Sequence, residues 1–179
     1  MIRIATQQIA LKPQDLFVLL ALSARDSQTM ATYAELAAQT GLASSAVHSA
    51  LKRSATAGLV RYQDRQPVLL KPQLLEFIVS GAKYAFPAVH GRVTRGVPTA
   101  YAAAPLNSVI APSVDPPPVW PHKNGNVRGV SLMPLYPTAP DAALRNRKLY
   151  ALLALFDAVR SGQARERNLA QRMLEERFR

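Results

Sequence analysis

One short stretch of the chain gathers polar side chains that can contact a nucleic acid. At about 100° per residue, a helix beginning near Ser44 places a set of six polar residues on one continuous arc. Its members are Ser45, His48, Ser49, Lys52, Arg53 and Thr56. The opposite arc carries only small or apolar residues, namely Ala46, Val47, Ala50, Leu51, Ser54, Ala55 and Ala57. Hydroxyl, imidazole and cationic groups can bond to base edges and phosphates, so this two-faced helix is typical of one that enters a DNA major groove.

A second helix and a tight turn are expected to position this face. In the stretch TYAELAAQTGLASSAVHSALKR, Thr32 and Glu35 form a capping-box pattern, in which each side chain satisfies a free backbone amide. The helix that starts there is expected to close at Gly41. Ser44 is predicted to cap the following helix, which should end at Gly58.

A β-hairpin is predicted directly after these two helices. Residues 59–62 and 68–70 are strand formers, and residues 63–67 between them are a polar tip. Arg61 and Arg65 give this hairpin a basic character. Outside this unit, the sequence predicts an apolar helix from Pro13 and another from Pro72, and Ile2 and Ile4 alternate as in a short strand.

Residues 11–84 resemble the winged helix-turn-helix of MarR-like bacterial transcriptional regulators. Ala37, Gly41 and Val47 stand at the helix-turn-helix spacing, and the basic hairpin takes the place of the wing. The resemblance implies a homodimer that binds double-stranded DNA at a pseudo-palindromic site and regulates nearby genes. Over its full length the chain is also similar to uncharacterised bacterial regulators, through its GVPTA, PVWP and RER segments, and that similarity implies no activity.

The resemblance assigns a DNA contact to residues of both helices and of the hairpin. The candidates are Tyr33, Ser44, Ser45, His48, Ser49, Lys52, Arg53, Arg61 and Arg65. The two serines at the helix start can bind phosphate together with free backbone amides. Arg61 and Arg65 are expected on the adjacent backbone or minor groove, and Tyr33 either touches phosphate or packs. The alternative interpretation is a helical core domain with no nucleic-acid role.

The composition also favours a polyanionic partner. The chain of 179 residues has a net charge of +11 and a hydrophobic content of 49%. Lys and Arg that neutralise phosphates release counterions, although a charge that only confers solubility is the alternative. The charge is spread along the chain, since residues 1–84, 85–140 and 141–179 have net charges of +4, +3 and +4. Without an apolar run of the ~18 residues that span a membrane, we expect a cytoplasmic protein with no membrane partner.

A proline-rich segment separates the front of the chain from its end. Eleven of the fourteen prolines lie in residues 87–140, which rules out long helices there. Trp120 and other apolar residues favour an ordered, extended segment that lies against another part of the protein or its dimer partner, and a disordered tether is the alternative. Asn124–Gly125 predicts a hairpin turn between residues 119–120 and 127–132.

The fold class expected from these patterns is mainly α with a small β-hairpin wing. We divide the chain into a winged helix-turn-helix domain (1–84), a proline-rich extended segment with a hairpin (85–140) and a C-terminal helical pair (141–179). Because its two helices are apolar, the C-terminal pair is expected to dimerise or to bind a partner, and residues 85–179 together are expected to offer a surface for a protein partner. The alternative function is therefore a protein-interaction or antitoxin-like module, and a third is a small-molecule sensor with Trp120 or Tyr136 lining its pocket.

Signals for catalysis or for a cofactor are weak. The chain has no cysteine, and His48, His90 and His122 are far apart with no further ligands at metal spacing, so we expect no metal, no cofactor and no enzyme. Asp157, with the charged residues 165–167, is interpreted as a surface ion-pair network or a pair at a helix N-terminus, and an active cluster is the less favoured alternative. The basic turn at 91–96 is either an exposed loop or a phosphate contact, and the loop is favoured.

Overall fold

The computed structural model describes residues 8–25, 31–111 and 113–179, so the short strand suggested by Ile2 and Ile4 lies outside the described residues. The α-helices are α1 (Pro13–Ser23), α2 (Tyr33–Thr40), α3 (Ser44–Thr56), α4 (Lys71–Glu76), α5 (Ala82–Ala85), α6 (Ala139–Arg145), α7 (Arg147–Ser161) and α8 (Ala164–Phe178). A π-helical turn, η1 (Phe77–Gly81), joins α4 to α5, and two 3-10 turns are η2 (Ala100–Ala102) and η3 (Leu106–Ser108). The strands are β1 (Val60–Gln63), β2 (Gln66–Leu69), β3 (His90–Pro98), β4 (Pro118–Pro121) and β5 (Val127–Leu132).

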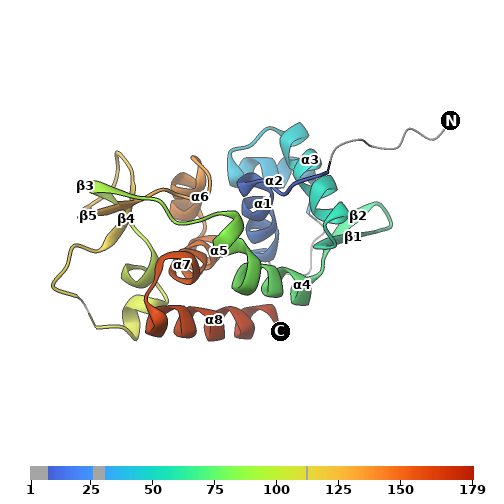
Figure 1. The fold of residues 1–179 in the computed structure, drawn as a ribbon. Helices are drawn as coiled ribbons and strands as arrows, with labels where there is room; N and C mark the ends of the chain where they lie inside the picture. Colours follow the sequence, from blue (N-terminus) through green and yellow to red (C-terminus); the bar gives the residue numbers. More distant parts are fainter. Residues whose placement is uncertain (1–7, 26–30, 112) are drawn as a thin grey trace.

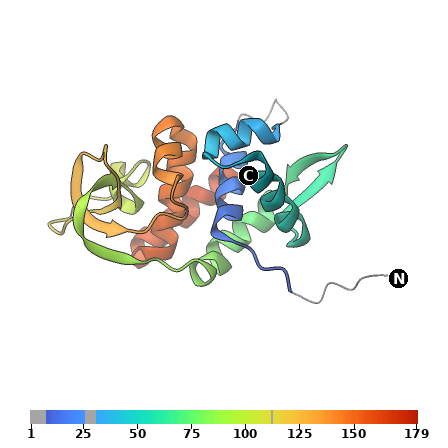
Figure 2. The same ribbon diagram turned by 90° about the horizontal axis from the view of Figure 1, so that it is seen from above.

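The fold is mixed α and β. Helices occupy the middle of the molecule, the β1–β2 hairpin projects at one end, and β3, β4 and β5 form a separate sheet at the other (Figure 1). The second view shows the same arrangement (Figure 2). The expected mainly α fold with one small hairpin is therefore incomplete, because the proline-rich segment builds a sheet of its own.

Helix α1 lies at the centre of the core. Residues 16–21 are each at most 1% exposed, and a helix that is apolar on all sides is stable only when other elements surround it. Helices α2, α3 and α7 all pack against it. The predicted start at Pro13 is confirmed, since the proline takes the first turn, where its missing N–H is not needed.

Local signals set the ends of α2 and the start of α3. The Glu35 amide donates to Thr32 Oγ1 at 3.2 Å, and the Thr32 amide donates to Glu35 Oε2 at 2.9 Å, so the capping box is confirmed. Gly41 ends α2 at φ 72°, a left-handed conformation that glycine adopts without strain. The predicted cap at Ser44 is wrong: Ala43 precedes the first helical residue, Ser44, and makes no side-chain cap.

The predicted hairpin after α3 is confirmed as an antiparallel β1–β2 pair. Its register runs from Val60 opposite Leu69 to Gln63 opposite Gln66. Only Asp64 and Arg65 remain for the tip, at φ 50° and 64°. Two successive left-handed residues are the geometry of a type I′ turn, whose twist matches that of the strands.

The three-stranded sheet curls into a small closed barrel. Strand β3 pairs antiparallel with both β4 and β5, which meet each other in parallel at Val119 and Ser131. The predicted hairpin at Asn124–Gly125 is therefore wrong, because the strands that flank this turn run in the same direction. A Cβ on Gly125 would lie 2.3 Å from the Cα of Gly96, so glycine allows the connecting loop to cross β3 closely.

The end of the chain forms three helices, so the predicted C-terminal pair is wrong. Asn146, at φ −139°, interrupts the helical run, and its side chain accepts from the Lys148 and Leu149 amides to cap α7. Helix α7 is buried by α1, α5, α6, α8 and the barrel-side turn η2. Its apolar surface thus finds its partner within the chain, and one hydrophobic core runs through all three sequence segments.

A buried polar cluster ties α7 to the barrel. Asp157 is 1% exposed and accepts from Trp120 Nε1 at 2.6 Å, Thr99 Oγ1 at 2.7 Å and Arg160 Nε at 2.8 Å. The predicted surface ion-pair network at Asp157 is wrong, because this residue lies on the core face of α7. The fully bonded carboxylate holds the proline-rich segment in an ordered arrangement, as the sequence predicts.

Candidate nucleic-acid interface

Helix α3 has one exposed face and one buried face. Ser44, Ser45, His48, Lys52 and Thr56 are exposed, and Ser49 is half-buried. Val47, Ala50, Leu51 and Ser54 are fully buried on the other side. Packing against α1 and α2 uses the apolar face and leaves a row of hydroxyl, imidazole and ammonium groups in solvent.

Arg53 departs from the predicted arrangement. Its Nε and one terminal nitrogen donate to the two carboxylate oxygens of Asp15, at 2.8 and 2.6 Å. The Asp15 side chain is 0% exposed and that of Arg53 is 19% exposed. Hydrogen bonding to Asp15 raises the pKa of Arg53 further above its usual range. The expectation that Arg53 faces the groove is corrected: the side chain fixes α3 to the start of α1.

A sequence signal for this pair exists in α1. Asp15 is the one acid in an otherwise apolar helix, and a buried carboxylate requires a cation or several donors. It also accepts from the Lys12 amide at 2.9 Å. The sequence did not show which cation would reach it, because Arg53 lies 38 residues further along the chain.

Aromatic side chains join α2, α3 and the hairpin. The rings of Tyr33 and His48 meet edge to face, with centroids 5.3 Å apart. Burial, and then a hydrogen bond with Tyr33, raises the pKa of Tyr62 to about 12. Tyr33 is half-buried and packs against His48, as expected from the packing alternative for this residue. Tyr62 is a member of this cluster that the sequence did not single out.

The hairpin carries the remaining candidate residues. Arg61 and Arg65 are both exposed, the first on β1 and the second at the tip. Asp64 lies beside Arg65 and is also exposed. On α2, Glu35 is engaged with Arg25 at 3.1 Å, and the hydrogen bond from the Thr32 amide keeps the pKa of its carboxyl below the usual range.

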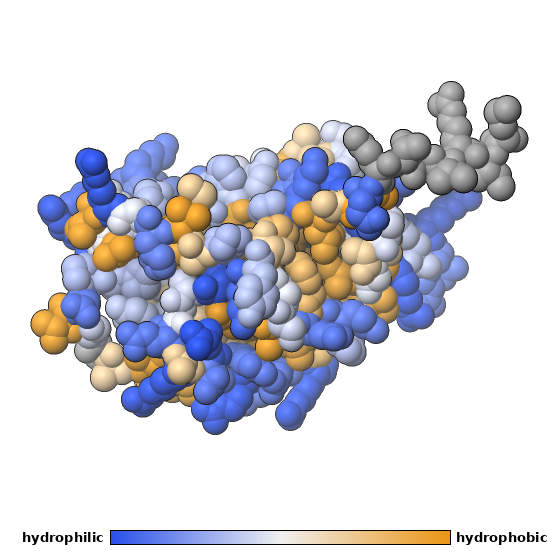
Figure 3. Space-filling view, viewed as in Figure 1, coloured by the Kyte–Doolittle hydropathy of each residue, from blue (hydrophilic) through white to orange (hydrophobic). Residues whose placement is uncertain are grey.

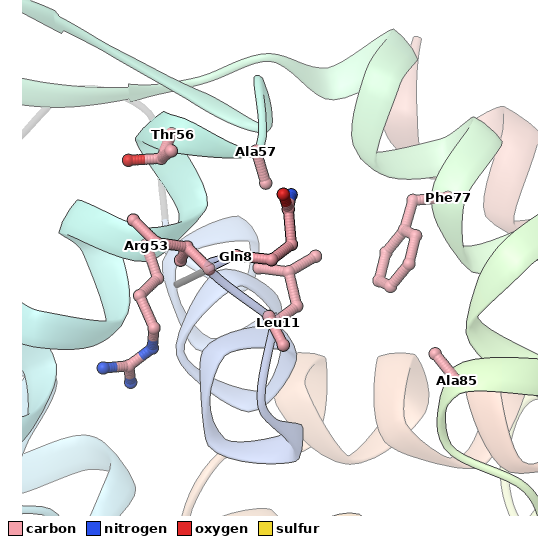
Figure 4. A pocket seen from close by; sticks show the side chains of 9 residues that line it. Gln8, Leu11, Arg53, Thr56, Ala57, Phe77 and Ala85 are labelled. Atoms are coloured by element: carbon pink, nitrogen blue, oxygen red, sulfur yellow. The ribbon is translucent and has the colours of Figure 1, made fainter. Parts of the chain in front are cut away.

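A pocket of 650 Å³ lies behind the C-terminal end of α3. It is lined by residues 8–11, the end of α3, η1 and α5. Arg53 and Phe77 lie on opposite sides of this pocket, and the guanidinium of Arg53 points away from Phe77, as its pairing with Asp15 requires (Figure 4). Trp120 and Tyr136 were expected to line a sensor pocket. Instead, Trp120 donates to Asp157 and Tyr136 stacks on Phe17.

No metal or membrane element accompanies this surface in residues 8–25, 31–111 and 113–179. No group of three or more potential metal ligands occurs among them. His122 bonds through Nε2 to Asp141 at 3.0 Å, and His48 packs on Tyr33. None of the helices in this part of the chain has the length and apolar character needed to cross a bilayer.

Comparison of the chain with models of protein families, with curated proteins and with solved structures found no match. Helix α3 and the β1–β2 hairpin are therefore the features of the molecule that indicate a function.

Proposed function

We propose that this protein binds double-stranded DNA as a transcriptional regulator of the winged helix-turn-helix, MarR-like type. Helix α3 enters the major groove, and the β1–β2 hairpin lies on the adjacent backbone or minor groove. The observation that carries the proposal is the exposed row from Ser44 to Thr56 on a helix whose opposite side is buried at Val47, Ala50, Leu51 and Ser54.

The exposed groups fit this role chemically. Lys52 and His48 can donate to base acceptors or phosphates, and the hydroxyls of Ser45 and Ser49 can donate or accept. Ser44 and Ser45 stand at the start of a 13-residue helix, where free amides favour a phosphate. Exposed Arg61 supplies a charge to the backbone beside the groove.

The hairpin is rigid enough to position such a contact. Four cross-strand pairs and a two-residue tip leave it little freedom, and β1 packs against α3. The hairpin and α3 are therefore held in a fixed relation, which lowers the entropic cost of engaging two parts of a duplex together.

Lys52→Ala is the direct test. Lys52 is exposed, so its loss should leave the free energy of unfolding within about 0.5 kcal/mol of the parent value. Binding to a selected duplex should weaken by about 1–3 kcal/mol if the ammonium contacts a base. Fluorescence anisotropy of a labelled duplex over a series of salt concentrations measures this change.

Arg172→Ala is the matched control, because it removes one charge from an exposed position of α8. This variant should bind the duplex as the parent does. Equal binding by the parent and Lys52→Ala would contradict the placement of α3 in the groove.

The proposal includes a homodimer. Two copies should occupy half-sites about 34–36 Å apart, one helical turn of DNA, related by the two-fold symmetry of the protein. Sedimentation of the complex with a duplex of known length gives the number of copies bound. A single copy on a site with no internal repeat would contradict this part of the proposal.

A protein-interaction or antitoxin-like role remains the alternative proposal for residues 85–179. The apolar helices that motivated it are covered within the chain. Val89, Val93 and Met133 are large apolar side chains that stay exposed at the barrel, at 49%, 45% and 59%. Because one core spans the molecule, a test of a protein partner requires the whole chain and not a fragment ending near residue 84.

A further inference from the structure

The three-stranded barrel carries a group of cations that no internal interaction explains. Arg95 on β3 and Arg128 on β5 are directly opposite each other in the antiparallel register. Residues paired in this way point to the same side of a sheet, and both arginines are exposed. Lys123 is exposed in the loop between β4 and β5, next to His122, whose amide donates to the Arg95 carbonyl at 3.4 Å. We call these three residues the barrel patch.

The opposed positions of Arg95 and Arg128 lower the stability of the folded protein. Like charges directly opposite each other on two strands repel and lower stability. No residue of the barrel patch has an ion-pair partner in the described part of the chain. The carboxylate of Asp141 is bound to the neighbouring His122. An external anion would remove the repulsion.

The barrel also fixes the backbone that carries the two strand cations. A Cβ on Gly96 would lie 2.1 Å from the Trp120 carbonyl oxygen, and a Cβ on Gly129 would lie 2.0 Å from the Pro117 carbonyl oxygen, so the strands cross closely. Trp120 is fixed in turn by its bond to Asp157 of α7. The backbone that carries Arg95 and Arg128 is thus positioned before any ligand binds.

We propose that the barrel patch is a second DNA-contacting surface, which binds phosphates of the duplex outside the segment that α3 occupies. This inference rests on the proposed function. The barrel and the β1–β2 hairpin lie at opposite ends of the molecule in both ribbon views (Figures 1 and 2). Hydrophilic side chains project from the barrel end in the space-filling view (Figure 3).

The chemistry selects phosphate over bases as the contact. The three cations stand on a strongly curved surface made of short strands and a loop, with no helix to enter a groove. Phosphate contacts position a protein on the duplex and carry no sequence information. The barrel patch should therefore add affinity and length to the binding site without changing the sequence preferred.

The test is the double variant Arg95→Gln/Arg128→Gln in the full chain. Each phosphate that the variant no longer neutralises should reduce the slope of log K against log salt by about 0.9, so the slope should become shallower by about 1.8. Selection from a random duplex pool should return the same preferred sequence for the variant and the parent. The thermal midpoint should not fall, because the substitution removes a repulsive pair.

Arg165→Gln/Arg172→Gln is the matched control, since it removes two exposed charges from α8. Its salt slope should equal that of the parent. Lys123→Gln provides a separate single-site variant in a loop, with an expected reduction of about 0.9.

Three results would overturn the inference. If the parent binds DNA, the barrel patch alone is contradicted when the Arg95→Gln/Arg128→Gln variant keeps the parent's salt slope. The barrel patch alone is also contradicted when the α8 control shows as large a reduction in slope as this variant. A parent that binds no duplex DNA at any salt concentration contradicts both this inference and the proposed function.

Discussion

Lys52 and Arg53 are neighbours in the chain with opposite structural roles. Lys52 projects into solvent, whereas Arg53 makes two charge-assisted hydrogen bonds to a carboxylate that has no exposure of its own. Such bidentate pairs are the strong ones among ion pairs, and burial of Asp15 makes this one costly to break. At the residue scale, only the first of these two cations is available to a ligand.

The Arg53→Ala variant should therefore be less stable than the parent. Removal of one partner leaves Asp15 charged and buried, and the free energy of unfolding should fall by about 3–5 kcal/mol. Urea denaturation followed by far-UV circular dichroism measures the decrease. Lys52→Ala is the control from the next position along the helix, and a similar decrease in the two variants would contradict the assignment.

The difference between these two residues shows what local sequence information leaves out. The two-faced pattern of α3 predicted the buried residues Val47, Ala50, Leu51 and Ser54, because helical periodicity sets the faces. Ala57, on the same arc, lies past the last helical residue and is exposed. The pattern also placed Arg53 on the polar arc. Its partner Asp15 belongs to another helix, and only the packing of α3 against α1 brings the two side chains together.

At the scale of elements, the local signals at Ser44 and at Asn124–Gly125 did not predict the structure, whereas four others did. These are α1 with its proline, the capping box of α2, the glycine turn and the β1–β2 hairpin. The barrel was not predicted, because Gly96 and Gly125 meet across 29 positions of the chain and the segment between them has no repeating pattern. The break at Asn146 was missed because the apolar residues 142–144 and 149–156 on its two sides fit one continuous helix.

The hairpin tip allows its charge to be separated from its conformation. Arg65 has φ 64°, which glycine adopts more readily than arginine. Arg65→Gly should keep the free energy of unfolding or raise it by up to about 1 kcal/mol, while the salt slope of DNA binding falls by about 0.9. Denaturation and anisotropy measurements on the same preparation test both effects.

Arg65→Lys is the control for this prediction, because it retains the charge at the same backbone angle. It should bind with the slope of the parent. If Arg65→Gly binds as strongly as Arg65→Lys, the hairpin tip does not contact phosphate.

The contact between α7 and β3 should respond to alkaline pH. Tyr150 donates to the Pro98 carbonyl at 2.6 Å, and burial raises the pKa of its phenol to about 12. An unfolded tyrosine ionises near 10, so folding favours the neutral phenol. Its stabilising contribution is complete below about pH 10 and is lost as the pH rises from about 10 to 12.

Tyr150→Phe isolates this effect. Parent and variant should differ in unfolding free energy by a constant amount up to about pH 10, and the difference should shrink above it. Urea titrations at several alkaline pH values measure the difference. Tyr62, with a pKa of about 12, remains in both proteins and so cancels in the comparison. A difference that is the same at pH 9 and pH 11 would contradict the buried, neutral state of Tyr150.

At the scale of the whole molecule, one core connects the two ends. Helices α1 and α7 pack together in the middle, with α3 and the hairpin on one side and the barrel on the other. The sequence predicted that the proline-rich segment lies against another part of the protein or its dimer partner, but no local pattern showed that this segment shares one core with both ends. The continuous core means that a ligand on α3 and a ligand on the barrel would be held by one folded unit.

Selection of bound duplexes from a random pool, performed with the parent and with Lys52→Ala, tests the central proposal most directly. The parent should enrich one defined sequence in two half-sites about one helical turn apart. Lys52→Ala should relax the preference at one position of each half-site, by about 1–3 kcal/mol, and keep it elsewhere. A parent that enriches no sequence, or a variant whose preference matches that of the parent at every position, would contradict the reading of DNA by α3.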